Sequence, residues 1–315
     1  MNCHEGENIK DNIRKALQKS GAVAIGFAKA APVEADVIDG YNRWIEKGNN
    51  AGMDYLKRHA ALKADPSHVL ENVATVISLA FSYAPYQRRD PSLPKIAFYA
   101  YGEDYHEVLR KRLKPIVELL KNECGGEWRI CIDSAPLPER YWAIKCGIGK
   151  RGKNGSVIVD NFGSYIFLAE ILTTVTVAPD EPRGDMCIGC GDCIKACPQG
   201  ALKSDGTIDA RKCINYLTIE HRGKWEKENM DAMQTEAAKN SLYGCDICQE
   251  VCPHNRNIPA TNIPEFRPKD ELLSLTSEEA MKMTQEEFSK FFKGSPIKRA
   301  KLEGLARNAA NITID

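Results

Sequence analysis

The 315-residue sequence contains no apolar run of about 18 residues, so we expect no membrane-spanning helix. Its first residues, MNCHEGENIKDN, lack the apolar core of a secretory signal, which favours a cytoplasmic location. Forty-three basic residues balance forty-three acidic ones, so net charge indicates no nucleic-acid partner and excludes none, because binding follows local patches. No G-x-G-x-x-G or Walker motif is present, which argues against nicotinamide or nucleotide binding.

Cysteine, by contrast, is concentrated in two runs. The first has the spacing C-x2-C-x2-C-x3-C-P, typical of ferredoxins with two [4Fe–4S] clusters, and it consists of Cys187, Cys190, Cys193 and Cys197. A second, incomplete copy ends in the same C-x3-C-P and consists of Cys245, Cys248 and Cys252. Cys213 lies upstream of this copy and can supply its missing ligand. Eight thiolates are enough for two clusters.

Zinc and disulfides are the two alternatives for these cysteines. Zinc takes four ligands per ion and has no use for a third cysteine three residues on, so the spacing favours iron–sulfur clusters. Thiols stay reduced in the cytoplasm, where clustered cysteines usually bind metal. For the cysteines outside both runs we expect only small buried or incidental thiols; these are Cys3, Cys124, Cys131 and Cys146.

Hydrophobic periodicity predicts an α+β chain, with α/β-like alternation in its first part. Strands are expected over 22–27, 73–81 and 128–133, and a helix over 104–124 that contains Pro115. Residues 156–160 and 165–177 should form a hairpin or adjacent strands across Asn161-Phe-Gly163. Further on, Thr276-Ser-Glu-Glu resembles a helix start, and 297–312 reads as a basic amphipathic helix.

Composition divides the chain into three predicted parts. Prolines and glycine at 179–184 mark a boundary, so residues 1–180 form a first domain with a central sheet. Residues 181–257 hold both cysteine runs in a ferredoxin-like module, with 214–244 inserted between its half-motifs. Residues 258–315 form a helical segment. Because two clusters alone need only about 60 residues, we expect the first domain to receive their electrons.

Two features of the first domain could carry chemistry. Asp133 ends an apolar strand and is followed by Ser-Ala-Pro-Leu-Pro138, so it is either a helix cap or an acid with a raised pKa. On the residues alone, capping is favoured. The stretch from Gly147 to Gly155 is glycine-rich and basic, and it is equally compatible with a phosphate cradle and with a surface turn.

Several segments together resemble the epoxyqueuosine reductase family, whose members are cobalamin-dependent enzymes of queuosine synthesis in tRNA. They follow one another over most of residues 50–256: Gly52-Met-Asp-Tyr-Leu56 with Arg58, Tyr101-Gly-Glu-Asp-Tyr-His106, Asp133-Ser-Ala-Pro-Leu-Pro-Glu-Arg140, Gly149-Lys-Arg-Gly-Lys-Asn154, Phe162-Gly-Ser-Tyr165, both cysteine runs, and Tyr216-Leu-Thr-Ile-Glu-His-Arg-Gly223. The Glu-His-Arg-Gly segment inside the insertion is the most specific of them.

The resemblance implies a set of roles. Asp133 would lie beside base-off cobalamin as proton donor, with a pKa raised by burial. The corrinoid contacts implied are Arg58, Asp133, Lys153, Asn154, Val157, Leu168 and Asp246. One cluster would be held by Cys187, Cys190, Cys193 and Cys252, and the other by Cys197, Cys213, Cys245 and Cys248. Electrons from an external donor such as flavodoxin or ferredoxin would pass through both clusters to cobalamin, and epoxyqueuosine would be reduced to queuosine.

The implied partner is the anticodon stem-loop of a tRNA, bound by an enzyme that we expect to be monomeric. Candidate RNA contacts are His221, Arg222, Lys224 and Arg299, the last within a basic group that is equally readable as a solvated helix face. Only the start of the HEAT-like repeat found in many family members follows the cluster module. Two alternatives stay open: a corrinoid reductase of a small molecule, similar to a dehalogenase, and an electron-transfer protein without catalysis.

Overall fold

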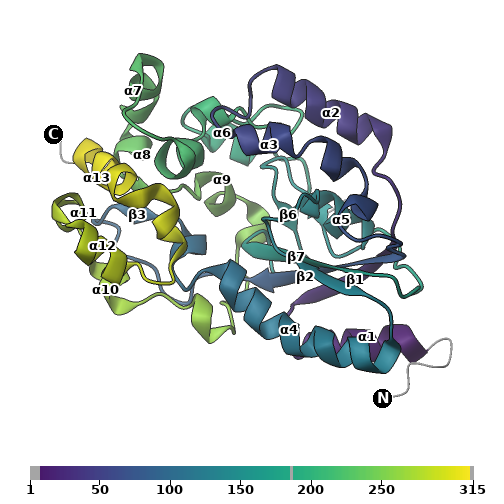
Figure 1. Cartoon of the computed structure of the whole chain (residues 1–315). Helices are drawn as coiled ribbons and strands as arrows, with labels where there is room; N and C mark the ends of the chain where they lie inside the picture. Colours follow the sequence, from purple (N-terminus) through teal and green to yellow (C-terminus); the bar gives the residue numbers. More distant parts are fainter. Residues whose placement is uncertain (1–7, 185–186, 313–315) are drawn as a thin grey trace.

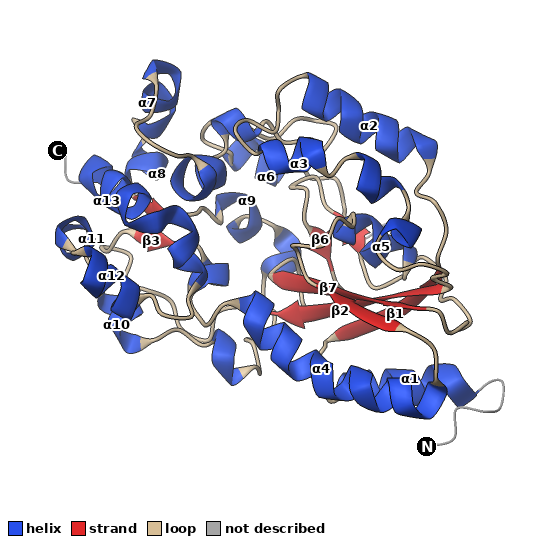
Figure 2. Cartoon of the chain, in the orientation of Figure 1, coloured by secondary structure: helices blue, strands red, loops and turns tan. Residues whose placement is uncertain are grey.

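The computed structural model describes residues 8–184 and 187–312. Its centre is an antiparallel four-stranded sheet in the order β1-β2-β7-β4 (Figure 1). The strands are β1 Ala24–Lys29, β2 Thr75–Ser82, β7 Ile166–Thr173 and β4 Trp128–Cys131. Helices surround this sheet and make up most of the remaining chain (Figure 2), so the α+β prediction is confirmed.

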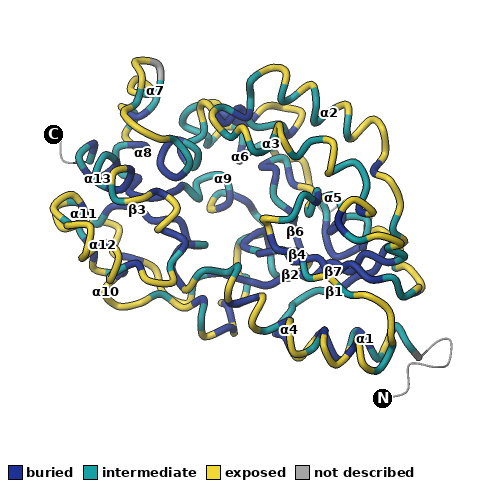
Figure 3. Tube along the Cα trace, viewed as in Figure 1, coloured by how far each residue is buried: buried dark blue, intermediate teal, exposed yellow. Residues whose placement is uncertain are grey.

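The sheet is buried on both faces, because successive side chains of a strand point to opposite sides. Phe27, Leu79 and Ile171 face one core, which is covered by helices α1 (Asn8–Gln18) and α4 (Tyr105–Cys124). Ala28, Ala80 and Leu172 face a second core, which is covered by α5 (Glu139–Lys145). Figure 3 shows the strands as the most continuously buried part of the trace. Site residues near the strand ends are therefore held on a rigid support.

Helices and turns of the first part connect these strands. Helix α2 (Ala35–Glu46) and short α3 (Asp54–Arg58) lie between β1 and β2 and are followed by the 3-10 turn Ala61–Ala64. Helix α4 runs for 20 residues, with Pro115 inside it and Asp104 as its N-cap. The loop after α5 contains a small ribbon of β5 (Lys150–Arg151) and β6 (Val157–Ile158). This ribbon carries the glycine-rich segment.

The cysteine-bearing part and the C-terminal part pack against the first. Their helices are α6 Asp192–Ala196, α7 Lys227–Met233, α8 Glu236–Lys239, α9 Ile247–Glu250, α10 Asp270–Ser274, α11 Ser277–Lys282, α12 Gln285–Phe291 and α13 Lys301–Ile312. Strand β8 (Ser241–Tyr243) pairs in parallel with β3 (Lys95–Ile96), which ties the insertion to the first part. One continuous core extends from Ile13 through Phe167 to Ala309.

Two element predictions are wrong. The expected hairpin across Asn161 does not form, because β6 pairs with β5, and only Val159 and Gly163 form a bridge next to that turn. The C-terminal helix begins at Lys301 and not at Ile297, because Pro296–Ala300 is a 3-10 helix and Lys301 takes a φ of 61°. The helix start at Thr276 is confirmed as a capping box with Glu279.

No helix within 8–184 or 187–312 is both long enough and apolar enough to span a lipid bilayer. The longest, α4, carries charged residues along its exposed side.

Candidate redox and proton-transfer site

Four thiols of the two cysteine runs line one small cavity. They are Cys187, Cys190, Cys193 and Cys252, and the cavity is closed by Lys153, Asn154 and His254, among others. Cys252 comes from the second run, so the two runs exchange a cysteine, as in two-cluster ferredoxins. Cys190 is exposed, whereas Cys193 and Cys252 are buried. This group therefore reaches the protein surface on one side.

The other four thiols form a second group. Burial is the main reason that the pKa of Cys245 is raised to about 12, and the nearby Cys213, Asp246 and Cys197 contribute to this rise. Burial also raises the pKa of Cys248, followed by the thiols of Cys245 and Cys213, then Asp246 and Cys197. Thiols in such surroundings stay protonated until a bound cation displaces the protons. Cys213 therefore lies where the second run lacks a ligand.

The two groups together supply eight thiols, which is four for each of two [4Fe–4S] clusters. Of the cysteines outside the runs, Cys131 and Cys146 are buried free thiols, and Cys3 lies outside the described residues. Cys124 packs at the edge of the main core and is disulfide-bonded, so the expectation of an incidental thiol is wrong for this residue.

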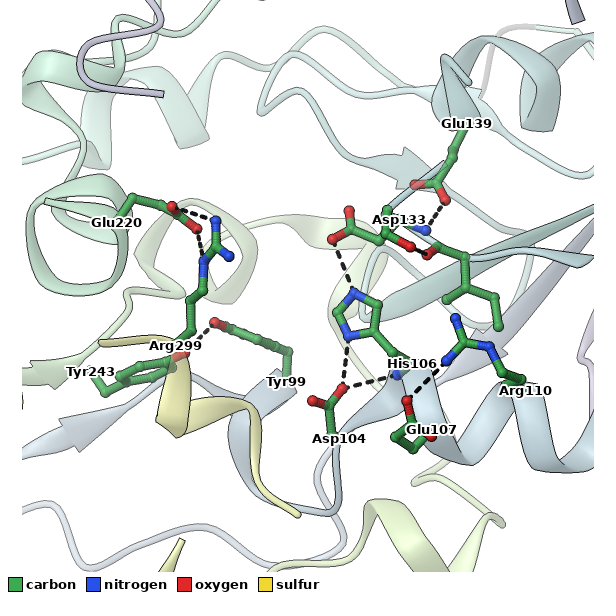
Figure 4. A network of polar contacts seen from close by, with 12 residues as sticks. Tyr99, Asp104, His106, Glu107, Arg110, Asp133, Glu139, Glu220, Tyr243 and Arg299 are labelled. Atoms are coloured by element: carbon green, nitrogen blue, oxygen red, sulfur yellow. Dashed lines mark hydrogen bonds and ion pairs between the residues drawn. The ribbon is translucent and has the colours of Figure 1, made fainter. Parts of the chain in front are cut away.

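Asp133 lies in the loop after β4, in contact with a histidine (Figure 4). Its Oδ2 is 3.1 Å from Nε2 of His106, and Nδ1 of His106 is 2.7 Å from Oδ1 of Asp104. Asp104 is also the N-cap of α4 and accepts the backbone N–H of His106. The start of α4 thus fixes the imidazole between two carboxylates. The capping alternative belongs to Asp104 and not to Asp133.

The hydrogen bonds among Asp104, His106 and Asp133 determine which of these side chains carries a proton. A hydrogen bond from His106 is the main reason that the pKa of Asp133 lies below its usual value, although partial burial opposes it. The prediction of a raised pKa for Asp133 is therefore wrong for the protein side chains alone, because they lower this pKa. Burial lowers the pKa of His106, but hydrogen bonds to Asp104 and Asp133 outweigh it and raise that pKa to about 9. At neutral pH the proton is on His106.

Aromatic side chains frame the array. The ring of Tyr105 stacks on that of His106 at 4.1 Å and on that of Phe167 at 4.3 Å, so the imidazole rests on a rigid aromatic layer. Across from it, both carboxylate oxygens of Glu220 accept hydrogen bonds from Arg299 at 2.9 Å (Figure 4). The negative charge of Asp133 raises the pKa of Arg299, after the larger effect of Glu220, which places both pairs in one electrostatic environment.

Some predicted corrinoid contacts gather near Asp133. The β4–β7 register ends with Cys131 opposite Glu170, two residues before Asp133 and two residues after Leu168. Leu168 is half-buried and packs on the same core as Val157. Half-buried Phe162 borders that core as well. An apolar surface next to a carboxylate fits a large planar ring such as a corrin.

The other predicted contacts lie elsewhere. Lys153 and Asn154 border the first thiol group, and the Asn154 amide is 3.5 Å from the backbone oxygen of Cys248. Arg58 is exposed on α3. Asp246 accepts the backbone N–H of Phe98 at 2.7 Å, and burial raises its pKa to about 7. The structure therefore does not collect all seven predicted residues around Asp133.

The predicted RNA contacts lie on one surface built from two distant segments. Arg222 donates hydrogen bonds to the backbone oxygens of Ile219 and Arg299. His221 is 3.1 Å from the backbone oxygen of Lys224, and Lys224 itself is exposed. Arg222 therefore also helps to hold residues 220–224 against the segment around Arg299.

Sequence reasoning missed three site residues. His106 was noted only as part of a family segment, and nothing in its spacing shows that Asp133 would reach it. Glu139 accepts the backbone N–H of Asp133 at 2.5 Å. Glu170 is completely buried in β7. The signal for Glu170 was present, since it is the one charged residue in the apolar run from Ile166 to Thr173.

Comparisons with known proteins agree with this geometry. A family model described as "4Fe-4S double cluster binding domain" matches residues 186–255, and one described as "Epoxyqueuosine reductase QueG, DUF1730" matches residues 63–134. An epoxyqueuosine reductase of Cyclobacterium marinum is 39% identical over 300 residues, which cover 94% of each chain. That of Escherichia coli is 34% identical over 89% of this chain and 76% of its own.

Solved structures are similar as well. A crystal structure of epoxyqueuosine reductase with an epoxyqueuosine-modified tRNA-Tyr stem-loop has a TM-score of 0.85 at 27% identity, covering 97% of this chain and 80% of that chain. The Streptococcus thermophilus enzyme has a TM-score of 0.84 at 29% identity, with the same coverage. A Bacillus subtilis structure, with a TM-score of 0.83 at 26% identity, covers 97% of this chain and 81% of its own, and has its aspartate-bearing catalytic loop swung out of the active site.

Proposed function

The chain belongs to the epoxyqueuosine reductase family, and we propose that it reduces epoxyqueuosine to queuosine in the anticodon loop of tRNA. The observations that support this most directly are the Asp104–His106–Asp133 array and, in the same chain, the two groups of four thiols. The reaction consumes two electrons and two protons and releases the epoxide oxygen as water. It therefore needs an electron route and a proton source in one place. We assign it to the cytoplasm, with residues 1–180 as the catalytic domain, 181–257 as the cluster module and 258–315 as a helical support.

The electron route would use both thiol groups. Cys187, Cys190, Cys193 and Cys252 would hold one [4Fe–4S] cluster, and Cys197, Cys213, Cys245 and Cys248 the other. When bound, the clusters supply single-electron transfer and cobalamin supplies the reducing chemistry at the epoxide carbon. The exposed Cys190 would put the first cluster within reach of an external donor such as flavodoxin or ferredoxin. The half-buried Leu168 and Phe162, which pack on the core that contains Val157, would carry the corrin face.

The proton route uses the array at α4. His106 carries the proton in the resting site, and Asp133 accepts its hydrogen bond. As negative charge develops on the epoxide oxygen, the proton of His106 passes to Asp133 across the 3.1 Å contact and from Asp133 to that oxygen, and the second proton of the reaction comes from solvent. Asp104 then stabilises the imidazole and holds its orientation. Asp133 thus acts as the immediate donor, and His106 as the store.

Replacing His106 with glutamine tests this store. We expect kcat/KM to fall by about 10²-fold, because glutamine keeps a hydrogen bond and cannot carry the proton. In the unmodified chain, kcat/KM should fall as pH rises through about 9, since His106 then loses its proton, and this alkaline limb should disappear in the variant. The raised pKa also stabilises the folded chain fully below pH 6.5, and that contribution is lost as pH rises through about 9.

The exposed His68 provides the matched control, and His68→Gln should keep both the rate and the alkaline limb. An unchanged limb in His106→Gln would assign the titration to another group.

The surface around Arg299 is the proposed RNA contact. Replacing Arg299 with alanine should weaken binding of the tRNA stem-loop roughly tenfold and lower the slope of log K against log salt by about one, since one phosphate-directed charge is removed. Fluorescence anisotropy at several salt concentrations measures both quantities. Arg183, whose side chain is about as exposed as that of Arg299 and pairs with Asp160, is the matched control. If Arg299→Ala leaves the salt slope unchanged, Arg299 contacts no phosphate and only pairs with Glu220.

The function is tested by turnover. Protein loaded with iron, sulfide and cobalamin is incubated with a reductant and tRNA that contains epoxyqueuosine, and the nucleosides are analysed by mass spectrometry. Queuosine should replace epoxyqueuosine. Unchanged nucleoside combined with reduction of a halogenated small molecule would favour the dehalogenase-like alternative. Failure to retain cobalamin would favour an electron-transfer protein.

A further inference from the structure

Two carboxyl groups lie together beneath Asp133 and have no part in the mechanism above. Glu139 is the first residue of α5, and Glu170 is in the middle of β7. Glu170 is completely buried, and its Oε1 accepts a hydrogen bond from the hydroxyl of Ser78 at 3.1 Å. Its Oε2 is also buried and makes no hydrogen bond of standard geometry to any described residue. A buried carboxylate oxygen without a hydrogen-bond partner lowers the free energy of unfolding unless it carries a proton.

The positive charges near Glu139 and Glu170 are too few to neutralise both carboxylates if both were ionised. Lys63 and Arg140 face Glu139, but Asp133 faces it too and adds negative charge. The other titratable neighbours of Glu170 are Asp133 and the buried thiols of Cys131 and Cys146, none of which is positive. Burial has the largest effect on the pKa of Glu170, and the negative charge of Glu139 has the second largest. Both effects raise this pKa. Glu170 is completely buried, and the partly buried Glu139 is its side-chain hydrogen-bond partner, so the two carboxyl groups do not both ionise and hold one proton between them.

The pair also holds the catalytic loop. Glu139 Oε1 accepts the backbone N–H of Asp133 at 2.5 Å. Asp133 has a φ of 52°, which a residue with a side chain rarely adopts without outside support. No strand partner takes this N–H, because β4 ends at Cys131. The carboxylate of Glu139 is therefore what fixes the conformation from which Asp133 reaches His106.

We propose that Glu139 and Glu170 share one proton, and that this pair is a positioning device that holds the Asp133 loop in its catalytic conformation. The neutral Glu170 donates to Glu139, and the ionised Glu139 accepts from the Asp133 backbone. Loss of the shared proton would set two anions against each other and release the loop. The importance of the device for catalysis rests on the proposed function, whereas the shared proton and the held loop do not.

The shared proton is tested by infrared spectroscopy at neutral pH on the cluster-loaded protein. The spectrum should contain the carbonyl stretch of protonated carboxylic acids, to which Asp246 with its pKa of about 7 also contributes. The difference spectrum between the unmodified chain and Glu170→Gln, which is nearly isosteric, should show the loss of one such band, whereas Glu118→Gln, on the exposed side of α4, is the control and should show none. A difference spectrum for Glu170→Gln without a lost band would overturn the assignment of the proton to this pair.

The held loop is tested by hydrogen exchange on peptides that contain residues 132–138. Glu139→Ala should speed exchange at the Asp133 amide at least tenfold, whereas Glu139→Gln keeps an acceptor oxygen and should preserve protection. Glu118→Ala should exchange like the unmodified chain. With tRNA as substrate, Glu139→Ala should lower kcat about tenfold at an unchanged KM, and glutamine should restore most of it.

Equal exchange in Glu139→Ala and the unmodified chain would overturn the positioning role. Neither infrared band nor exchange rate depends on turnover, so a chain that fails to reduce epoxyqueuosine would still allow both measurements. Failure of the proposed function is thereby distinguishable from failure of this inference.

Discussion

Asp133→Asn should lower kcat by about 10²- to 10⁴-fold and leave both clusters, cobalamin and tRNA binding in place, which is the range of an essential general acid. The amide of asparagine can accept the hydrogen bond of His106, so the array keeps its shape. It cannot pass a proton to the epoxide oxygen. Single-turnover kinetics with reduced protein would separate this loss from slower electron delivery.

Asp160→Asn is the control for this experiment, because Asp160 is an exposed partner of Arg183 and has no contact with the array. Should Asp133→Asn turn over at the normal rate, the proton donor must be sought among His106 and bound water.

Cys213→Ala should reduce turnover to background and remove about half of the bound iron. Cys213 stands outside both dense runs, and its thiol is close to those of Cys245, Cys248 and Cys197. Its loss leaves three ligands in an enclosed group, which interrupts the electron route even if the first cluster remains. Iron analysis and the visible spectrum measure the first effect, and the nucleoside assay measures the second.

Cys146→Ala provides the comparison, since Cys146 is a buried thiol outside both groups. Full iron content in Cys213→Ala would mean that a different residue completes the second cluster.

The cysteine pattern could be read from sequence because its information is local. Ligands three and four positions apart define a cluster site regardless of the surrounding fold. The strands over 73–81 and 128–133 were likewise apparent from apolar, β-branched runs, and β2 and β4 occupy most of those ranges. Asp133 was found because it ends such a run.

The partners of Asp133 could not be read in this way, because they come from three separate elements. His106 is the second residue of α4, Glu139 is the first of α5 and Glu170 lies within β7. The sheet register sets Glu170 opposite Cys131, and the packing of both helices on the sheet brings His106 and Glu139 to the same loop. The error in the pKa of Asp133 has the same origin, since burial was foreseeable and the nearby imidazole was not. The expected hairpin failed because strand pairing depends on partners distant in sequence.

The pairing of β2 with β7 has a consequence for how the chain folds. Ser78 and Glu170 are 92 positions apart, yet their strands are neighbours at the centre of the sheet. Closing so long a loop is slow, and contacts of this separation place a chain among slow folders. The first thiol group is completed by Lys153 and Asn154, which lie in the loop that this pairing closes. We therefore expect sheet formation to precede cluster assembly, so that iron and sulfide supplied during refolding are taken up only after the slow phase.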